Sequence, residues 1–333
     1  MANKILITGA SGFIGSFVAE EALRRNMEVW AAVRKTTNRR YLQDERIHFI
    51  ELDFSSKEQM KASMQSHRWD YIVHAAGATK CLKKEDFFRV NTEGTKNFVD
   101  AIMELGIIPE KFIFLSSLSA FGAVREQQPY EDILDSDTPQ PNTAYGKSKM
   151  EAERYLDSLG SSMCIVTLRP TGVYGPREKD YFLMADSIKK HVDFAVGYKP
   201  QVITFVYVQD LVNAVFLAIE NGIGGRKYFI SDGKAYKSTD FSDLIRHELG
   251  DKFMLRIKAP VWFLKIVCSC GELMARLTGK MSALNNDKFN ILKQRNWLCD
   301  IRPAIEELKY EPQYDLEKGV HLSMEWYKKE GWL

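Results

Sequence analysis

Short apolar runs alternate with segments of helical periodicity through the first half of the chain. The apolar runs predict buried strands at residues 5–7, 28–33, 48–51, 71–75, 111–116 and 164–169. Helical spacing predicts helices at residues 13–25, 57–66, 84–105 and 142–159. Strands this apolar, separated by helices, are typical of βαβ units with a parallel sheet covered on both faces. The pattern therefore predicts an α/β fold with a Rossmann-type, doubly wound parallel sheet.

The pattern becomes less regular after Pro170. A loop at 171–177 precedes elements predicted at 180–190 (helix), 201–206 (strand), 209–220 (helix), 227–230 (strand) and 240–249 (helix). We therefore expect a dinucleotide-binding domain at residues 1–170, to which 201–232 partly return. Residues 171–200 and 233–333 should form a smaller, mainly helical substrate-binding domain. Within it, the amphipathic segment 260–277 is either a core helix or a lid over an apolar substrate.

Composition narrows the classes of protein. The chain has 333 residues, and its 46 Lys and Arg against 44 Asp and Glu give a net charge of +2, which argues against a general nucleic-acid binder. No apolar run approaches the ~20 residues that span a bilayer. The first residues lead straight into a core strand, and the five cysteines show no metal-ligand spacing. We expect a reduced, cytoplasmic protein without a metal site or membrane span.

A glycine-rich turn separates the first strand from the first helix. The sequence Thr8-Gly9-Ala10-Ser11-Gly12 breaks the strand, and helical spacing resumes at Phe13. Glycines let the backbone approach a pyrophosphate, and a helix N-terminus directs its free N–H groups and dipole at it. A merely structural turn is the alternative. We expect a dinucleotide to be held here by Gly9, Ser11, Gly12, Phe13, Ile14 and Gly15.

Basic residues follow the second strand. Arg34 and Lys35 stand where an NAD-selective site usually places Asp or Glu for the ribose hydroxyls. A cationic pair suits the 2′-phosphate of NADP, with which Arg makes paired, charge-assisted bonds. A solvated surface loop is the alternative, because basic residues are common in loops. The sequence favours NADP as the cofactor, while NAD stays open.

Tyr145 and Lys149 lie four residues apart at the start of a predicted helix, so they share one face. A free phenol has a pKa near ~10. A cation ~4 Å away, at an effective dielectric of ~20, is worth about 4 kcal/mol, or roughly three pKa units. We therefore expect Lys149 to bring the phenol of Tyr145 close to neutral pH, where a general acid–base works best.

These segments together resemble the extended short-chain dehydrogenase/reductase superfamily, the NAD-dependent epimerase/dehydratase family, over nearly the whole chain. The resemblance rests on Gly9-x-x-Gly12-x-x-Gly15, on Asn91-Thr92-Glu93-Gly94-Thr95, on Tyr145-x-x-x-Lys149, on Arg169-Pro170, on Val173-Tyr174-Gly175-Pro176 and on the segment 205–210. It implies a Rossmann domain, a bound nicotinamide dinucleotide and a Ser–Tyr–Lys active site. The catalytic residues are then Ser117, Tyr145 and Lys149, with Ser116 and Ser119 as less favoured serines.

The resemblance also implies further cofactor contacts. Asp53, followed by Phe54, matches the position where the family bonds the adenine amino group, although a helix-entry residue is the alternative. Small residues after the fourth strand let the backbone run close to the ribose. The residues expected to contact the cofactor beyond the glycine-rich turn are Arg34, Lys35, Asp53, Phe54, Ala75, Ala76, Gly77, Tyr145, Lys149 and Pro170. His74 is interpreted as a core histidine, and Asn91 as a support for the active-site lysine.

Two positions depart from the nucleotide-sugar enzymes of the family. Those enzymes usually carry Asn where this chain has Gly172, and Arg where it has Ile203 and Thr204, both as phosphate ligands. The departures resemble the branch of dihydroflavonol reductases and 3β-hydroxysteroid dehydrogenases. We therefore expect an NAD(P)-dependent oxidoreductase acting on a small, fairly apolar ketone or secondary alcohol. The alternatives are a nucleotide-sugar epimerase or dehydratase and a non-catalytic dinucleotide-binding regulator. A homodimer could form through the two long helices.

Overall fold

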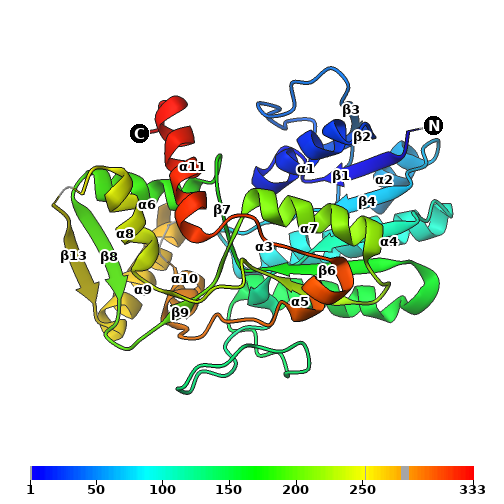
Figure 1. Ribbon diagram of the computed structural model, residues 1–333. Helices are drawn as coiled ribbons and strands as arrows, with labels where there is room; N and C mark the ends of the chain where they lie inside the picture. Colours follow the sequence, from blue (N-terminus) through cyan, green and yellow to red (C-terminus); the bar gives the residue numbers. More distant parts are fainter. Residues whose placement is uncertain (1, 252, 279–284) are drawn as a thin grey trace.

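A seven-stranded parallel sheet runs through the molecule in the order β11-β6-β5-β4-β1-β2-β3 (Figure 1). Its strands are β1 (Lys4–Thr8), β2 (Glu28–Val33), β3 (His48–Glu51), β4 (Tyr71–His74), β5 (Lys111–Leu115), β6 (Ile165–Pro170) and β11 (Lys227–Ile230). The computed structural model describes residues 2–251, 253–278 and 285–333. The predicted doubly wound parallel sheet is confirmed, and its first six strands lie within one residue of the predicted bounds.

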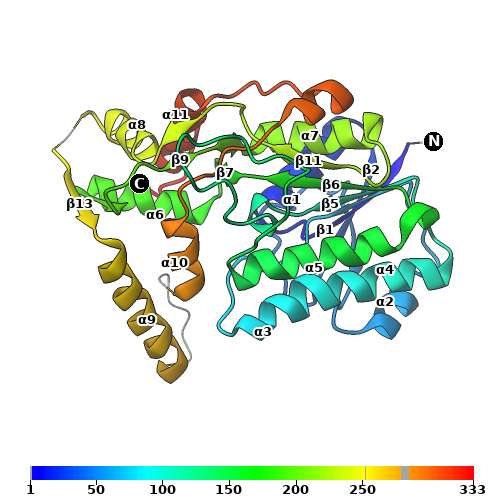
Figure 2. The same ribbon diagram turned by 90° about the horizontal axis from the view of Figure 1, so that it is seen from below.

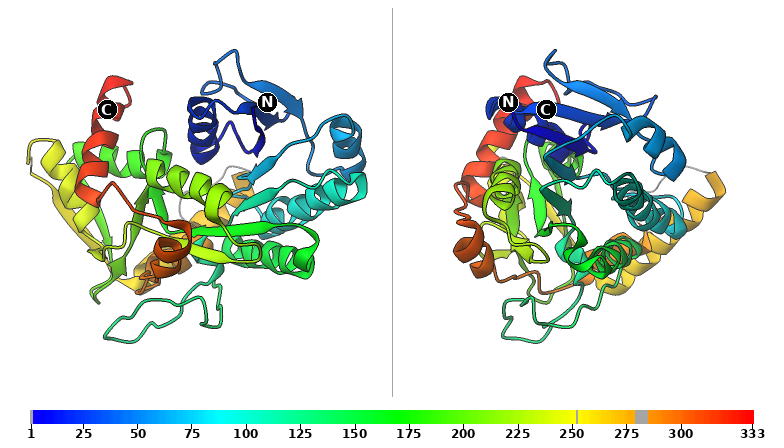
Figure 3. Two further views of the ribbon diagram at one scale, coloured as in Figure 1. Left: turned by 45° about the vertical axis from the view of Figure 1, so that its right-hand side comes forward. Right: turned by 90° about the vertical axis from the view of Figure 1, so that its right-hand side faces the viewer.

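Helices cover both faces of this sheet, as the right-hand view of Figure 3 shows. The helices α1 (Phe13–Arg24) and α7 (Val208–Asn221) lie on one face, and α2 (Lys57–Met64), α4 (Gly94–Leu105) and α5 (Ala144–Ser158) on the other. Strand β1 shows why its sequence is apolar without alternation. Ile5 and Ile7 pack into the core under α1 and α7, whereas Leu6 packs into the opposite core. Both sides of a central strand are thus buried.

The helix predicted at 84–105 is confirmed in its bounds, but it is not α-helical throughout. It consists of α3 (Lys84–Phe87), a π-helical turn at Phe88–Glu93, and α4. The wide turn contains Asn91, whose side chain accepts the N–H of Ala78 at 2.7 Å and donates to the Ala78 carbonyl at 3.1 Å. Its amide also donates to the Ser148 hydroxyl at 3.0 Å. Such turns are often found at functional sites, and this one fixes the loop after β4 to helix α5.

The remainder of the chain forms a smaller lobe that contains three two-stranded pairs. They are β7 (Gly172–Tyr174) with β10 (Phe205–Tyr207), β9 (Val202–Ile203) with β12 (Tyr236–Lys237), and β8 (Val192–Val196) with β13 (Leu255–Ala259). The strand predicted at 201–206 is therefore split, because the chain changes partners at Thr204, whose hydroxyl donates to the Trp297 carbonyl at 2.6 Å. The strands β8 and β13 were not expected.

Helices complete this lobe around an aromatic core. They are α6 (Lys179–Lys189), α8 (Asp240–Glu248), α9 (Val261–Thr278), α10 (Asn286–Lys293) and α11 (Leu316–Lys329). Short helical turns elsewhere in the chain lie at Leu118–Ala120, Gly160–Ser162 and Ala304–Leu308. Tyr174 packs edge-on against Phe205, Tyr207 and Phe241, with ring centroids 5.2–6.0 Å apart. This core holds β7, β10 and α8 together beside the carboxyl ends of the sheet strands.

Helix α9 differs from the sequence expectation. Only Leu264, Cys268 and Ala275 on it are buried among its described side chains. Figure 2 shows the helix standing out from the body, with α10 beside it. The expectation of a core helix is therefore wrong. Among the described residues, no helix is long and apolar enough to cross a membrane.

Candidate active site

A cavity of about 1180 Å³ opens at the carboxyl ends of the central strands. It lies where the strand order reverses between β1 and β4, whose last residues Thr8 and His74 are neighbours in register. Ligands of open α/β sheets bind at such a reversal. The structure brings nearly all predicted site residues to its wall: Gly9, Ser11, Gly12, Phe13, Ile14, Gly15, Arg34, Asp53, Phe54, Ala75, Ala76, Gly77, Ser117, Tyr145 and Pro170. Lys35 and Lys149 do not line it.

The glycine-rich turn packs its backbone closely against neighbouring backbone. Gly9 has φ +68°, and a Cβ there would lie 2.7 Å from the Ala75 carbonyl oxygen. A Cβ at Gly15 would collide with the Gly9 carbonyl, so α1 could not pack so closely on the turn. No side chain caps α1, and its first residues, Phe13 and Ile14, line the cavity. An uncapped helix N-terminus behind glycines fits the pyrophosphate of a dinucleotide.

Arg34 and Asp53 lie at the end of the cavity beyond β2 and β3. Arg34 is exposed, and its backbone N–H donates to the Thr37 hydroxyl at 2.9 Å. The Asp53 carboxylate accepts the hydroxyl and backbone N–H of Ser55 at 2.7 and 2.9 Å. These bonds, aided by the charge of Arg34, lower the pKa of Asp53. Asp53 therefore remains an anionic acceptor beside a cation.

His74 is buried below the cavity and fully hydrogen-bonded. Its Nδ1 lies 2.8 Å from the Thr8 hydroxyl and its Nε2 lies 2.9 Å from the Thr95 hydroxyl. Burial, together with the charge of Lys149, lowers the pKa of His74 to about 3. The ring is thus neutral and serves the core, in agreement with the sequence interpretation.

Ser117 and Tyr145 present their hydroxyl groups to the same cavity. Tyr145 lies in the first turn of α5, where the Thr143 hydroxyl accepts the Gly146 N–H at 2.9 Å. Ser117 precedes the short turn after β5 and accepts the Ser119 N–H at 3.1 Å. Burial raises the pKa of Tyr145 above its usual value of 10.0, and the nearby Ser117 hydroxyl opposes this rise.

The expected lowering of the Tyr145 pKa by Lys149 is therefore wrong for this structure. Lys149 is buried, and its Nζ donates to the Leu115 carbonyl at 2.8 Å and lies 4.8 Å from the centroid of the Phe114 ring. Burial lowers the pKa of Lys149 to about 8, although the charge of Glu153 opposes this. A Cβ on Gly77 would lie 3.3 Å from Nζ, so the ammonium group sits directly behind the cavity wall.

The two neighbouring serines have different surroundings. The Ser116 hydroxyl donates to the Glu153 carboxylate at 2.5 Å. Glu153 in turn forms a buried ion pair with Arg169 at 2.6 Å. All three serines, Ser116, Ser117 and Ser119, line the cavity, but the Ser116 hydroxyl is engaged in an internal cluster. This arrangement supports Ser117 over Ser116 as the serine that faces a substrate.

The smaller lobe supplies the other half of the cavity wall, and most of that wall is apolar. Its apolar residues are Val173, Met184, Phe194, Ala195, Val196, Ile203, Phe205, Phe241, Ile291, Leu292 and Trp297. Lys288 is the one cation among the described lining residues of this lobe, and it lies 3.9 Å from Asp180. No described residue of α9 lines the cavity, so that helix is not a lid in this structure.

Gly172 is packed tightly at the base of this half. A Cβ there would lie 2.6 Å from the Tyr181 hydroxyl oxygen and 3.3 Å from the Phe205 ring. A side chain at this position would force Tyr181 or Phe205 to shift, which disfavours the Asn of the nucleotide-sugar enzymes. Glu178, which the sequence analysis missed, also lines the cavity, accepts the Tyr181 N–H at 2.6 Å, and has its pKa raised by burial. Only its position before α6, as an N-cap, could have indicated it.

The sequence and the fold are similar to those of known proteins. The model of the NAD dependent epimerase/dehydratase family matches residues 5–231. The chain belongs to this family. A UDP-glucose 4-epimerase from Vibrio cholerae is 27% identical over 332 residues, covering 96% of this chain and 94% of that protein. A decarboxylating sterol-4-alpha-carboxylate 3-dehydrogenase from Schizosaccharomyces pombe is 23% identical over 348 residues and 98% of each chain.

A solved structure shows the same fold. The Thermus thermophilus UDP-glucose 4-epimerase in complex with NAD has a TM-score of 0.77 at 22% identity, covering 98% of this chain and 99% of that one. The resemblance to the extended short-chain dehydrogenase/reductases is confirmed, and the chain is an enzyme of this type. Its relatives include both a nucleotide-sugar epimerase and a sterol dehydrogenase, so similarity alone does not choose between the two functions.

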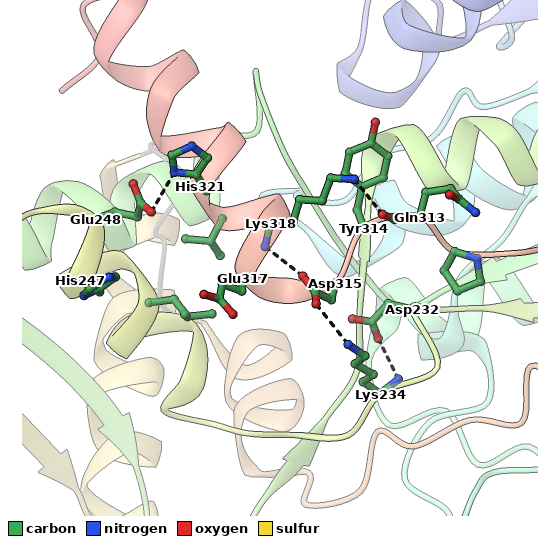
Figure 4. Close-up of a pocket in the computed structure, with 13 residues that line it drawn as sticks. Asp232, Lys234, His247, Glu248, Gln313, Tyr314, Asp315, Glu317, Lys318 and His321 are labelled. Carbon is green, nitrogen blue, oxygen red and sulfur yellow. Dashed lines mark hydrogen bonds and ion pairs between the residues drawn. The ribbon is translucent and has the colours of Figure 1, made fainter.

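The present protein has a second, smaller cavity of about 580 Å³ between α8, α11 and the chain near residue 232 (Figure 4). Some of its charged side chains pair with one another. Glu248 bonds His321 at 3.0 Å, and Lys234 pairs with Asp315 at 3.2 Å. None of the predicted catalytic or cofactor residues lines it. The larger cavity is therefore the candidate active site.

Proposed function

We propose that the protein is an NAD(P)-dependent oxidoreductase that interconverts a ketone and a secondary alcohol on a fairly apolar substrate. One observation carries the proposal. Ser117 and Tyr145 line a cavity whose other half is mostly apolar and whose wall at Gly172 is packed against Tyr181 and Phe205. Hydroxyl donors at the carboxyl ends of the strands suit a carbonyl oxygen, and apolar walls suit the carbon skeleton next to it.

The cofactor is a nicotinamide dinucleotide, which supplies or accepts the hydride when bound. The glycine-rich turn and the N-terminus of α1 hold its pyrophosphate. Asp53 accepts from the adenine amino group, while Ala75, Ala76 and Gly77 let the backbone run beside the ribose. Arg34, with Lys35 behind it, binds the 2′-phosphate, which makes NADP the preferred form. The exposed guanidinium of Arg34 at the cavity wall supports this preference.

Three side chains act at the reacting carbonyl group and at the cofactor beside it. Tyr145, which burial keeps protonated at neutral pH, donates its proton to the carbonyl oxygen as hydride reaches the carbon. Ser117 donates a hydrogen bond to the same oxygen and stabilises the charge that develops there. Lys149 places its ammonium group behind Gly77, where it would bond the nicotinamide ribose.

The second candidate is an NAD-dependent nucleotide-sugar epimerase. The similarity to the Vibrio cholerae UDP-glucose 4-epimerase over 96% of the chain favours it. A sugar-nucleotide diphosphate needs cationic or amide ligands. Gly172 and Ile203 provide neither, and Lys288 already lies beside Asp180. The lining of the cavity therefore favours the oxidoreductase.

Tyr145→Phe tests the mechanism. The substrate is first found by a screen of apolar ketones and UDP-sugars with NADPH and NADH, and single-turnover hydride transfer is then measured. Loss of the proton donor should reduce the rate ~10²–10⁴-fold, with little change in cofactor affinity. The matched control is Tyr155→Phe on the same helix, whose hydroxyl bonds Asp100 at 2.5 Å outside the cavity. Its rate should stay near that of the wild type.

Two results would decide against the proposal. A near-normal rate in Tyr145→Phe, with the fold intact, would assign the proton to another group. Saturable conversion of a UDP-sugar to its epimer without net change in NADPH or NADH, and no turnover of any apolar ketone, would establish the second candidate instead.

A further inference from the structure

Helix α5 begins with a turn that its own sequence supports weakly. Tyr145 and Gly146 stand in this turn, and glycine is a poor helix former. A Cβ at Gly146 would lie 2.1 Å from the Ser119 carbonyl oxygen, so a glycine is needed where the helix starts this close to the serine turn. The first turn also contains no acidic residue to complement the positive end of the helix dipole. Groups from other parts of the chain therefore have to hold Tyr145 in place.

An aspartate from the smaller lobe satisfies the N–H groups at this helix start. The first residues of a helix carry N–H groups that have no partner within the helix. The carboxylate of Asp287 accepts the N–H of Ala144 at 2.8 Å and the N–H of Tyr145 at 3.3 Å. The Thr143 hydroxyl accepts the third N–H, that of Gly146, at 2.9 Å. Asp287 thus supplies the missing negative charge from a position 142 residues beyond Tyr145 in the chain.

Helix α10, which carries Asp287, also forms part of the wall of the active-site cavity. Its residues Lys288, Ile291 and Leu292 line the cavity. At 3.6 residues per turn, Asp287 lies on the neighbouring stripe of the helix, which is directed at the start of α5. Figure 2 shows α10 between α9 and the start of α5. One short helix therefore contacts both the cavity and the backbone of Tyr145.

Two further hydrogen bonds fix α10 to the segment that leads into α5. The side chain of Asn290 donates to the Asn142 carbonyl at 2.7 Å, and the buried amide of Gln294 donates to the Gly122 carbonyl at 3.0 Å. Neither bond involves an N–H group of the first turn of α5. Removal of the Asp287 carboxylate should therefore leave α10 docked on this segment.

We propose that Asp287 is a positioning residue, which fixes the first turn of α5, and with it the phenol of Tyr145, against the cavity wall that α10 forms. The ring of Tyr145 also packs edge-on against Phe87 of α3, with the ring centroids 6.2 Å apart. A loosened first turn would let the phenol move from the substrate oxygen, and a shift of ~1 Å can cost ~10²-fold in rate. The proposal rests on the role of Tyr145 in the proposed function.

The rate of hydride transfer in Asp287→Ala tests the positioning. The substrate is whichever ketone or UDP-sugar the screen finds, so the test also applies when the oxidoreductase assignment fails. The rate at saturating substrate should fall about 10- to 100-fold, while KM should change less than about threefold because Ile291 and Leu292 stay in the wall. Asp287→Asn, whose neutral amide oxygen is a weaker acceptor, should be only about threefold slower than the wild type.

The matched control is Asn290→Ala, on the same helix and at the same contact. This substitution removes the bond to the Asn142 carbonyl but leaves the N–H groups of Ala144 and Tyr145 bonded to the aspartate. Its rate of hydride transfer should stay within about threefold of the wild-type rate.

Amide hydrogen exchange measures the same contact without any substrate. In the cofactor-free protein, the peptide that covers residues 143–147 should exchange at least about tenfold faster in Asp287→Ala than in the wild type, and Asn290→Ala should leave its exchange nearly unchanged. This measurement separates the two proposals. A near-normal rate in Tyr145→Phe counts against the proposed function, whereas unchanged exchange in Asp287→Ala counts against the positioning residue alone.

Three results would overturn the proposal. The first is a wild-type rate and wild-type exchange in Asp287→Ala, or in Asp287→Asn where only that variant folds. The second is an equal loss of rate in Asn290→Ala, which would attribute the effect to the docking of α10 as a whole. The third is a rise in KM without a fall in the saturated rate, which would assign Asp287 to the cavity wall and not to Tyr145.

Discussion

The buried charge of Lys149 makes a quantitative prediction about stability. Burial lowers the pKa of Lys149 from 10.5 to about 8. One pKa unit corresponds to ~1.4 kcal/mol, so the charged lysine costs the folded protein about 3 kcal/mol at pH 7. Between pH 8 and 10.5 the unfolded chain binds more protons than the folded one. The free energy of unfolding of the wild type should therefore rise with pH across this window.

Lys149→Met removes this titration. Met cannot donate to the Leu115 carbonyl, but that loss is similar at both pH values because a neutral amine still donates. The difference in unfolding free energy between wild type and Lys149→Met should therefore shift by about 2 kcal/mol in favour of the wild type from pH 7 to pH 10. Urea denaturation of the cofactor-free protein at the two pH values measures it.

The control for this experiment is Lys147→Met on the same helix. Lys147 is exposed, so its substitution should give nearly the same difference at pH 7 and pH 10. A pH-independent difference for Lys149→Met, or a shift that favours the variant at pH 10, would refute the reasoning that burial depresses the pKa of this lysine.

Two further predictions concern specificity. Arg34→Ala should weaken NADPH binding about 10- to 100-fold, as expected for charge-assisted bonds to the 2′-phosphate, and should hardly change NADH binding. An equal loss of affinity for both cofactors in a fluorescence titration would contradict the NADP assignment. Gly172→Asn should lower the free energy of unfolding by about 1–3 kcal/mol through overpacking against Tyr181, without creating affinity for UDP-sugars. A neutral effect in urea denaturation, or saturable sugar binding, would contradict the assignment of that position.

Much of the sheet could be predicted because its signals are local. Strand β1 and the turn at Gly9 are encoded within a dozen residues, and the strand order follows from the usual connections of βαβ units. The predictions that failed depend on partners distant in sequence. Strands β8 and β13 pair residues more than 60 positions apart, with Ile257 beside Phe194, and neither strand alternates clearly enough to stand out.

The chemistry of the site was predicted less fully than its position. Spacing places Tyr145 and Lys149 on one helix face, but it does not show where the ammonium group points. In the structure Lys149 is directed at the Leu115 carbonyl, and burial rather than a neighbouring cation dominates the pKa of Tyr145. Burial is a property of the packed molecule, so the sign of that pKa shift could not be read from residue spacing.

The pKa values of Tyr145 and Lys149 distinguish the proton donor, Tyr145, from Lys149, which titrates in the working pH range. Tyr145 has a pKa above 10 and stays protonated at pH 6–9, so its own titration should not limit ketone reduction there. Lys149, with a pKa of about 8, loses its charge within that range. If this charge holds the nicotinamide ribose in place, kcat/KM for reduction should be level from pH 6 to about 7 and fall above pH 8. Lys149→Met should be slower throughout, and its profile should lack the fall near pH 8. A fall that persists in Lys149→Met would mean that a different group, and not this lysine, sets the alkaline limit.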